Sequence, residues 1–172
     1  MNKTYIGIDN GITGAVGIIK YTGDLTHFKM PVKKELNYTK TKAYISRINS
    51  NLLETVLYTF LVKNTCTFSL NISNTLVIIE RPMVNPMRFK ASVSAIRALE
   101  ATLVIIEKFT LPYQYIDSKE WQRELLPKGL KKEELKKASL DVGNRLFPSL
   151  KDTFKEDADA ILIAEYARRK KL

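Results

Sequence analysis

Over the first thirty residues, hydrophobic and polar positions alternate or form short apolar runs, and this pattern predicts strands. The apolar segments cover residues 3–9, 14–20 and 25–30. Turn sequences separate them, first Asn10-Gly11 and then Thr22-Gly23-Asp24. Strands joined by tight turns pair antiparallel, so we expect the chain to begin with a three-stranded antiparallel sheet.

The hydrophobic period lengthens in the middle of the chain. After a polar loop over residues 36–42, apolar residues from Ala43 to Lys63 recur every three or four positions, which favours an amphipathic helix. A second helix, predicted over residues 91–109, is apolar nearly all round. Such a helix must be covered on more than one side. The sheet can cover one side, and either a second subunit or another helix of this chain can cover the other.

The remaining segments alternate between strands and helices. Leu76–Glu80 and Tyr113–Ile116 read as short buried strands, and Pro82 forbids continuation of the first one. The other predicted elements, in chain order, are a loop over residues 84–90, a short helix containing Trp121 and capped by Asp117, a basic helix over residues 131–147 and a closing helix within residues 154–172.

Composition predicts one soluble globular domain spanning residues 1–172. The chain is 45% hydrophobic and 27% charged, and it contains no apolar run near the roughly 20 residues that span a bilayer. No signal-peptide segment precedes the first strand. The single cysteine, Cys66, cannot form an internal disulfide, which fits a reducing cytoplasm. With His27 as the one histidine, a zinc site is not expected.

The net charge of +10 points to a polyanionic partner. Excess positive charge on a small domain most often serves nucleic-acid binding, and the basic helix over residues 131–147 could follow a phosphate backbone. The alternative is that these cations only keep the surface soluble. No membrane partner is expected.

Acidic residues stand where predicted elements end or begin. Asp9 ends the first strand, Glu80 ends a buried strand, and Glu156, Asp157 and Asp159 precede the apolar run of the closing helix. A buried negative charge at a strand end is costly unless it is neutralised, and a bound cation would neutralise it. Alternatively, Asp9 could simply cap a turn. The acids before the closing helix could likewise serve only to stabilise that helix through a favourable interaction with its dipole.

If residues 156–159 are helical, Glu156 and Asp159 share a face and Asp157 points elsewhere. Carboxylates from Asp9, Glu80, Glu156 and Asp159 would then repel one another unless hard divalent ions bind, and Mg²⁺ suits such ligands. Two ions about 4 Å apart can activate a water and stabilise the leaving oxygen of a phosphodiester. This combination with a basic surface favours a nuclease.

Three segments together resemble the acidic motifs of RuvC-like Holliday-junction resolvases, of the phage and organellar type. They are residues 7–14 (GIDNGITG), 77–80 (VIIE) and 156–160 (EDADA). The resemblance covers essentially the whole chain and implies an α/β fold of the RNase H-like class. Its mixed central sheet has three antiparallel N-terminal strands plus parallel strands, flanked by helices. Asn10 stands where many members have proline.

This resemblance implies symmetric nicking of four-way DNA junctions by a homodimer, with two Mg²⁺ ions per active site and Mn²⁺ as a possible substitute. Asp9, Glu80 and Asp159 match metal-binding catalytic positions. Members carry an acid or a histidine three residues before the last aspartate, which selects Glu156 here, whereas a small indel would select Asp157 instead. A phage-infected cell or an organelle matrix is the implied setting.

The expected DNA contacts lie in two segments. Arg88, Phe89 and Lys90 follow Glu80, and Phe89 could stack on unpaired bases or be a buried loop anchor. Family members also place lysines near the scissile phosphate, and the basic stretch over residues 128–137 resembles that region. From this stretch we select Lys131 and Lys132, with Lys132 as the lysine nearest the phosphate.

Other functions compatible with the motifs remain open. The chain could be another RNase H-like nuclease that cuts flaps, branched DNA, RNA–DNA hybrids or rRNA precursors. It could also be a non-catalytic module that binds DNA of a particular structure. Actin-like ATPases open with a similar glycine-rich motif but need two such domains, which 172 residues cannot hold, so no nucleotide cofactor is expected.

Overall fold

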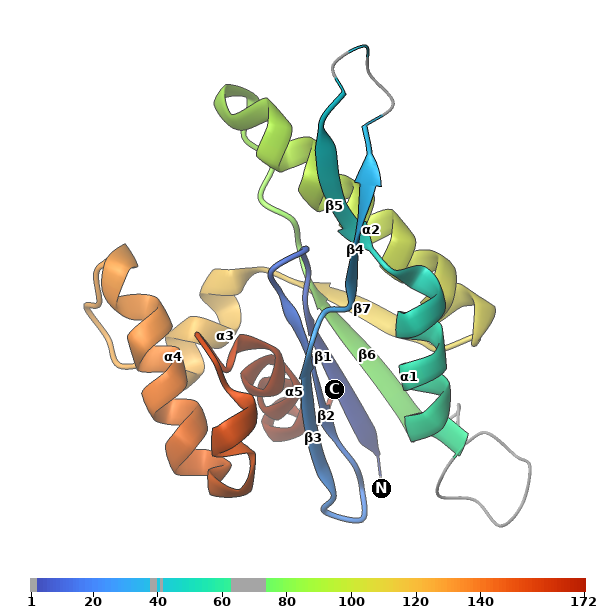
Figure 1. Ribbon diagram of the computed structural model, residues 1–172. Helices are drawn as coiled ribbons and strands as arrows, with labels where there is room; N and C mark the ends of the chain where they lie inside the picture. The colour runs from blue at the N-terminus through green and yellow to red at the C-terminus, as the bar shows by residue number, and fades with distance from the viewer. Residues whose placement is uncertain (1–2, 38–39, 41, 63–73) are drawn as a thin grey trace.

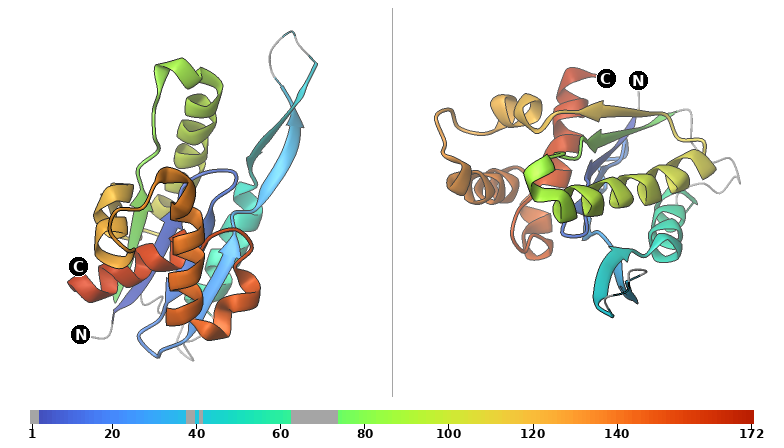
Figure 2. Two further views of the ribbon diagram at one scale, coloured as in Figure 1. Left: turned by 90° about the vertical axis from the view of Figure 1, so that its left-hand side faces the viewer. Right: turned by 90° about the horizontal axis from the view of Figure 1, so that it is seen from above.

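A five-stranded mixed sheet lies between two layers of helices (Figures 1 and 2). The computed structural model describes residues 3–37, 40, 42–62 and 74–172, so Cys66 lies outside the described residues. The strand order is β3-β2-β1-β6-β7. The strands are β1 (Thr4–Asp9), β2 (Ala15–Ile19), β3 (Leu25–Lys29), β6 (Thr75–Glu80) and β7 (Tyr113–Ile116).

The sheet confirms the predicted mixed topology. β1, β2 and β3 pair antiparallel, whereas β6 and β7 continue the sheet from β1 in parallel. Parallel strands end at the same edge of a sheet. The carboxyl ends of β1 and β6, where Asp9 and Glu80 stand, therefore lie side by side.

The helices divide between the two faces of the sheet. α1 (Ser50–Val62) and α2 (Phe89–Lys108) pack on one face, and α5 (Asp159–Lys170) packs on the other. α3 (Ser118–Leu125) and α4 (Lys132–Leu146) pack against α5. The chain also forms two short 3-10 helices, η2 (Pro86–Arg88) and η3 (Pro148–Thr153). No helix in the described ranges is long and apolar enough to cross a membrane.

Alternation along the strands decides which side chains face α5. Ile6 and Ile8 of β1 belong to the core beneath α1 and α2. Neighbouring side chains of a strand point to opposite faces, so Gly7 and Asp9 lie on the α5 side. The same alternation in β6 places Glu80 on the α5 side. Both acids therefore face the helix that begins with Asp159.

A pair of glycines lets the backbone of α5 approach the sheet. Gly7 and Gly17 are directly opposite each other in β1 and β2. A Cβ atom on Gly7 would lie 2.1 Å from the carbonyl oxygen of Ala160, and one on Gly17 would lie 2.5 Å from the backbone nitrogen of Ile161. No other residue type fits either position without moving the helix.

The prediction of a helix from Ala43 is wrong for its first residues. β5 (Tyr44–Ile48) instead pairs antiparallel with β4 (Val32–Leu36) in a separate two-stranded sheet, and the helix begins at Ser50. Ile45 and Ile48 are three residues apart, which imitated a helical period. The β-branched and aromatic residues of this segment favour a strand once a partner strand is available.

Helix α2 begins earlier than predicted. Residues 86–90, predicted as part of a loop, form η2 and the first residues of α2. The side chain of Asn85 accepts a hydrogen bond from the backbone N–H of Met87 at 2.9 Å. Ser92 both accepts from the N–H of Asn85 and donates to its carbonyl oxygen, each at 2.9 Å. These bonds satisfy backbone groups that a plain loop would leave to water.

Replacing Gly7 by alanine should destabilise the protein strongly. The added Cβ would overlap the α5 backbone, so we expect the free energy of unfolding to fall by at least about 3 kcal/mol in urea titrations. Gly23→Ala is the control. Gly23 has φ +92° but open space around it, so only the backbone cost of about 1 kcal/mol applies. Equal losses in the two variants would contradict the close approach of α5.

Candidate metal centre

Three aspartates converge at the carboxyl edge of the sheet. Asp9, Asp157 and Asp159 each offer a carboxylate oxygen, and these atoms all lie within 4.8 Å of one another. We call these three residues the carboxylate cluster. Asp9 ends β1, Asp157 lies in the segment before α5, and Asp159 is the first residue of α5. An all-oxygen set of this size could hold a hard divalent cation such as Mg²⁺.

Glu80 stands beside the carboxylate cluster at the end of β6. Its Oε2 atom accepts a hydrogen bond from the indole Nε1–H of Trp121 at 2.9 Å. Trp121 is fully buried in α3, so this bond fixes the carboxylate of Glu80 from a rigid position. The sequence placed Trp121 on a short helix but gave no sign of this contact.

Helix α4 holds the segment that carries Asp157 and Asp159. The hydroxyl of Ser139, a buried residue of α4, donates to Oδ1 of Asp159 and accepts from the N–H of Ala158 at 3.2 Å. One turn further along α4, a Cβ atom on Gly143 would lie 2.3 Å from the Cβ of Ala158. The close packing at Gly143 and the two bonds of Ser139 therefore set the position of Asp159.

Three carboxyl groups of the site hold their protons more tightly than free side chains do. Burial, followed by the neighbouring charges of Glu80, Asp159 and Asp157, raises the pKa of Asp9 from 3.8 to about 8. Burial also raises the pKa of Glu80 to about 7, against the opposing effect of the Trp121 hydrogen bond. The pKa of Asp159 rises to about 6, again mainly through burial. A divalent cation would remove this repulsion by replacing the protons.

The expectation that Glu156 rather than Asp157 projects with Asp159 is wrong in geometry. Helix α5 begins only at Asp159, so the three-residue helical spacing does not apply to Glu156. The side chain of Glu156 is 63% exposed, and its ion-pair partners are Lys29 at 3.9 Å and Lys136 at 3.8 Å. The side chain of Asp157 is only 13% exposed and lies in the carboxylate cluster.

Lys136 of helix α4 lies at the carboxylate cluster. Its Nζ atom is 3.5 Å from Oδ2 of Asp157, and its charge lowers the pKa of Asp9 and of Asp159. The sequence-based choice, Lys132, lies one helical turn earlier, at the start of α4. Positions 132 and 136 are one helical turn apart, so the two lysines lie on the same side of α4.

A groove of about 330 Å³ begins at Glu80 and runs beneath the start of α2. Arg88 lines this groove, whereas Phe89 is 72% exposed and Lys90 is also exposed. The alternative interpretation of Phe89 as a buried loop anchor is therefore wrong. The other lining residues are Asn10, Arg81, Pro82, Met83, Asn85, Ala91, Ser92, Ala95 and Ser118.

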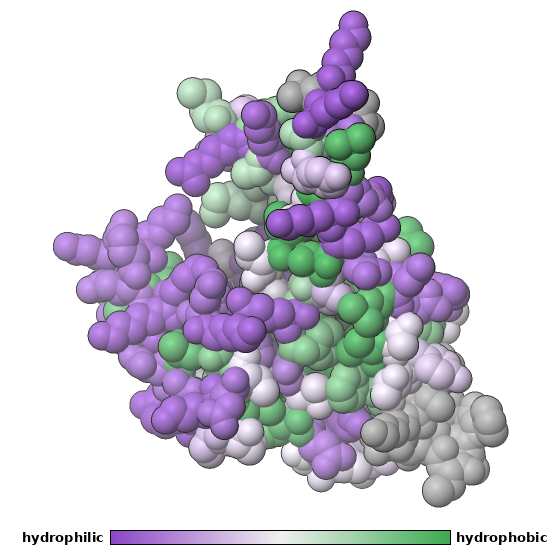
Figure 3. Space-filling view, viewed as in Figure 1, coloured by the Kyte–Doolittle hydropathy of each residue, from purple (hydrophilic) through white to green (hydrophobic). Residues whose placement is uncertain are grey.

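Hydrophilic side chains surround the site on two sides. Figure 3 shows them over α3 and α4 and again over the upper part of the molecule, where α2 begins. Lys131 and Lys132 are exposed at the start of α4. The cations selected from the sequence thus lie on both sides of the sheet edge that carries the acids.

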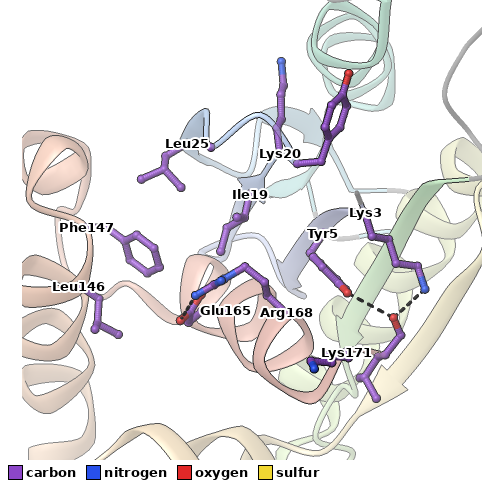
Figure 4. A pocket seen from close by; sticks show the side chains of 13 residues that line it. Lys3, Tyr5, Ile19, Lys20, Leu25, Leu146, Phe147, Glu165, Arg168 and Lys171 are labelled. Carbon is purple, nitrogen blue, oxygen red and sulfur yellow. Dashed lines mark hydrogen bonds and ion pairs between the residues drawn. The ribbon is translucent and has the colours of Figure 1, made fainter. Parts of the chain in front are cut away.

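A larger hollow, of about 790 Å³, lies at the opposite end of the sheet (Figure 4). Lys3, Lys20 and Lys171 line it, together with Glu165, which is paired with Arg168. This end of the molecule is far from the carboxyl ends of β1 and β6, because it holds the start of β1 and the last residues of α5.

Comparison with solved structures identifies the fold. A structure of Thermus thermophilus RuvC in complex with a Holliday junction substrate matches over 96% of this chain and 93% of its own, with 15% identity and a TM-score of 0.54. The chain has a RuvC-like fold. A second Thermus thermophilus RuvC structure matches over 98% of this chain and 96% of its own, with 18% identity and a TM-score of 0.51. No family model and no curated protein matches the sequence.

The RuvC-like fold confirms the fold class and the resemblance predicted from the three acidic segments. These matches are too distant in sequence to carry an activity. What the chain can do chemically is therefore indicated by the geometry of the carboxylate cluster.

Without metal, the stability of the chain should fall as the pH rises from about 4 to about 8. The pKa of Asp9 is about 8 in the folded chain and 3.8 as a free side chain, so the folded state binds the proton more tightly over that window. Asp9→Asn removes the largest part of this penalty. At about pH 8 in EDTA, its Tm should exceed that of the wild type by on the order of 5 °C.

Millimolar Mg²⁺ should raise the Tm of the wild type more at about pH 8 than at about pH 6, because the ligands are then deprotonated. The Tm of Asp9→Asn should respond little. Asp141→Asn, an exposed site on α4, is the control and should behave as the wild type. A Tm of the wild type that ignores Mg²⁺ at both pH values would contradict the metal centre.

Proposed function

We propose that this chain is a divalent-metal-dependent endodeoxyribonuclease that resolves four-way DNA junctions. One observation carries the proposal: Asp9, Asp157 and Asp159 meet within 4.8 Å at the strand ends of a RuvC-like fold, with Glu80 beside them. The neighbouring solved structure of that fold was determined with a Holliday junction substrate. The basic surfaces on either side of the site suit the phosphate backbone of such a substrate.

Asp9, Glu80 and Asp159 would hold two Mg²⁺ ions, and Asp157 would complete the set in place of Glu156. When bound, such ions supply an activated water and neutralise charge on the leaving oxygen. The protein's own part is to fix the oxygens in advance, through Trp121 for Glu80 and through helix α4 for Asp159.

The cations have distinct roles in the proposal. Lys136 lies at the carboxylate cluster and lowers the pKa of Asp9, and it would contact the scissile phosphate. Arg88 and Lys90 would hold the backbone on the α2 side of the site, with Phe89 exposed between them for stacking on an unpaired base. Lys131 and Lys132 would hold it on the α4 side.

A homodimer is part of the proposal. Symmetric nicking of a four-way junction needs two active sites related by a two-fold axis. Helix α2 leaves Ile96 and Val104 exposed, at 42% and 61%, although it buries Ala98, Ile105 and Ile106 against the sheet. The exposed side of α2 is the surface that a second copy would cover.

The decisive experiment compares cleavage of four-way, three-way, flap and linear duplex DNA, and of an RNA–DNA hybrid, with Mg²⁺ and with EDTA. We expect paired nicks in the four-way junction only when metal is present. Asp9→Asn should lower the cleavage rate by on the order of 10³-fold or more while junction binding persists. Equal rates on all substrates would contradict junction specificity. Binding without any metal-dependent cleavage would favour a non-catalytic DNA-binding module.

The fourth metal ligand can be tested separately. Asp157→Asn should lower the cleavage rate by on the order of 10²-fold, because it removes an oxygen from the carboxylate cluster. Glu156→Gln serves as the matched neighbour and should stay within about threefold of the wild type, because its side chain is mainly exposed. A larger loss of cleavage rate in Glu156→Gln than in Asp157→Asn would indicate Glu156 as the fourth ligand. The rise in Tm with Mg²⁺ provides a second readout that does not depend on cleavage.

A further inference from the structure

The β4–β5 hairpin projects from the body of the protein at the same end of the sheet as the candidate metal centre. Figures 1 and 2 show it extending beyond the sheet, beside the first half of α2. Its strands, Val32–Leu36 and Tyr44–Ile48, form a two-stranded sheet separate from the main one. At about 3.3 Å per residue, each strand spans about 13 Å.

The root of the hairpin is fixed in the core. Ile48 and Met30 are both 4% exposed and belong to the core beneath α1 and α2. The backbone N–H of Asn49 donates to the carbonyl oxygen of Pro31 at 2.9 Å and closes the base. Ile48 also lies at a small cavity that includes Ile12, three residues after Asp9. The hairpin is therefore held in a set position relative to the carboxylate cluster.

Beyond its root, the hairpin is strongly basic. Residues 32–48 contain five cations and one acid, Glu35, which leaves a net charge of +4. Glu35 is shared between Lys33 and Arg47, with each nitrogen–oxygen distance at 2.5 Å. The remaining cations, Lys34, Lys40 and Lys42, are exposed.

One face of the hairpin combines apolar and basic groups. The register pairs Leu36 with Tyr44 and Lys34 with Ser46 on the same face, because alternate positions of a strand point the same way. Leu36 is 56% exposed and Tyr44 is 75% exposed. A cationic surface with an aromatic side chain, standing beside the candidate nuclease site, is complementary to a nucleic-acid backbone.

We propose that the β4–β5 hairpin is a second DNA-binding surface, which grips the phosphate backbone of a duplex arm leading away from the cleavage site. This inference rests on the proposed function for the identity of the substrate. Phosphate contacts hold a substrate in register without reading its sequence. The hairpin would thus orient the branched DNA, while the residues around Glu80 act at the cut.

The test reverses charge at two places. The hairpin variant carries Lys34→Glu, Lys40→Glu and Lys42→Glu. The matched control carries Lys3→Glu, Lys20→Glu and Lys171→Glu at the opposite end of the sheet (Figure 4). Three reversals of two units each lower the net charge by six in both proteins. Both are made in the Asp9→Asn background to prevent cleavage. Fluorescence anisotropy with a four-way junction and with one linear duplex arm gives the Kd over a range of salt concentrations.

We expect the hairpin variant to bind the junction at least about tenfold more weakly than the control. The slope of log K against log salt should become shallower by about 2–3, because each lost phosphate contact removes about 0.9. Equal Kd values and slopes in the two variants, with matching Tm values, would overturn the inference. Absence of junction cleavage by the wild-type protein would instead overturn the proposed function. The two failures are distinguishable because the binding comparison does not depend on cleavage.

A cross-linking experiment covers the case in which charge reversal disturbs folding. Tyr44→Cys in a Cys66→Ser background leaves one thiol, at the exposed end of β5. A photoactivated cross-linker on that thiol should yield protein–DNA adducts with the junction. Adducts between two protein chains, together with a changed mass in light scattering, would show that the hairpin binds a second copy and would overturn the inference.

Discussion

Direct contact between the backbone of α5 and the centre of the sheet determines where the functional groups can lie. Gly7 and Gly17 form a glycine pair in neighbouring strands, and the first turn of α5 rests on it. The helix start is thereby brought to the strand ends that carry Asp9 and Glu80. A side chain at either position would overlap the backbone of Ala160 or Ile161 and push the start of α5, with Asp159, away from the sheet. The chemistry of the site thus depends on two residues that have no side chain.

The second constraint is electrostatic. The protein gathers four acids where burial raises the pKa of three of them, a cost that folding must meet elsewhere. The surrounding structure limits the cost with fixed donors, Trp121 for Glu80 and Ser139 for Asp159. Lys136 adds a positive charge at the open side of the cluster. Such an arrangement is poorly suited to a purely structural role and well suited to exchange of protons for a cation.

The sequence predicted those parts of the molecule that depend on local pattern. Apolar runs that end in Asp9 and Glu80 correctly predicted where both strands end. A charged residue directly after a buried strand is rare, because an uncompensated charge there is costly. The hairpin was missed because Ile45 and Ile48 have a helical spacing and only the partner strand decides between the two structures. The position of Asp157 was predicted wrongly because α5 begins only at Asp159, and the packing of Ala158 against Gly143 beside it is a tertiary contact that no local pattern contains. The contact between Lys136 and Asp157 also joins separate segments of the chain, so no local pattern could predict it.

The hydrogen bond between Trp121 and Glu80 has a consequence for how the site can be observed. Trp121 is the one tryptophan of the chain, and its indole is fully shielded from water. Its emission therefore comes from a single environment, with the indole nitrogen 2.9 Å from a carboxylate oxygen of Glu80. Any event that changes the charge on that carboxylate changes the electric field across the indole. The protein carries its own optical probe of the site, with no label to attach.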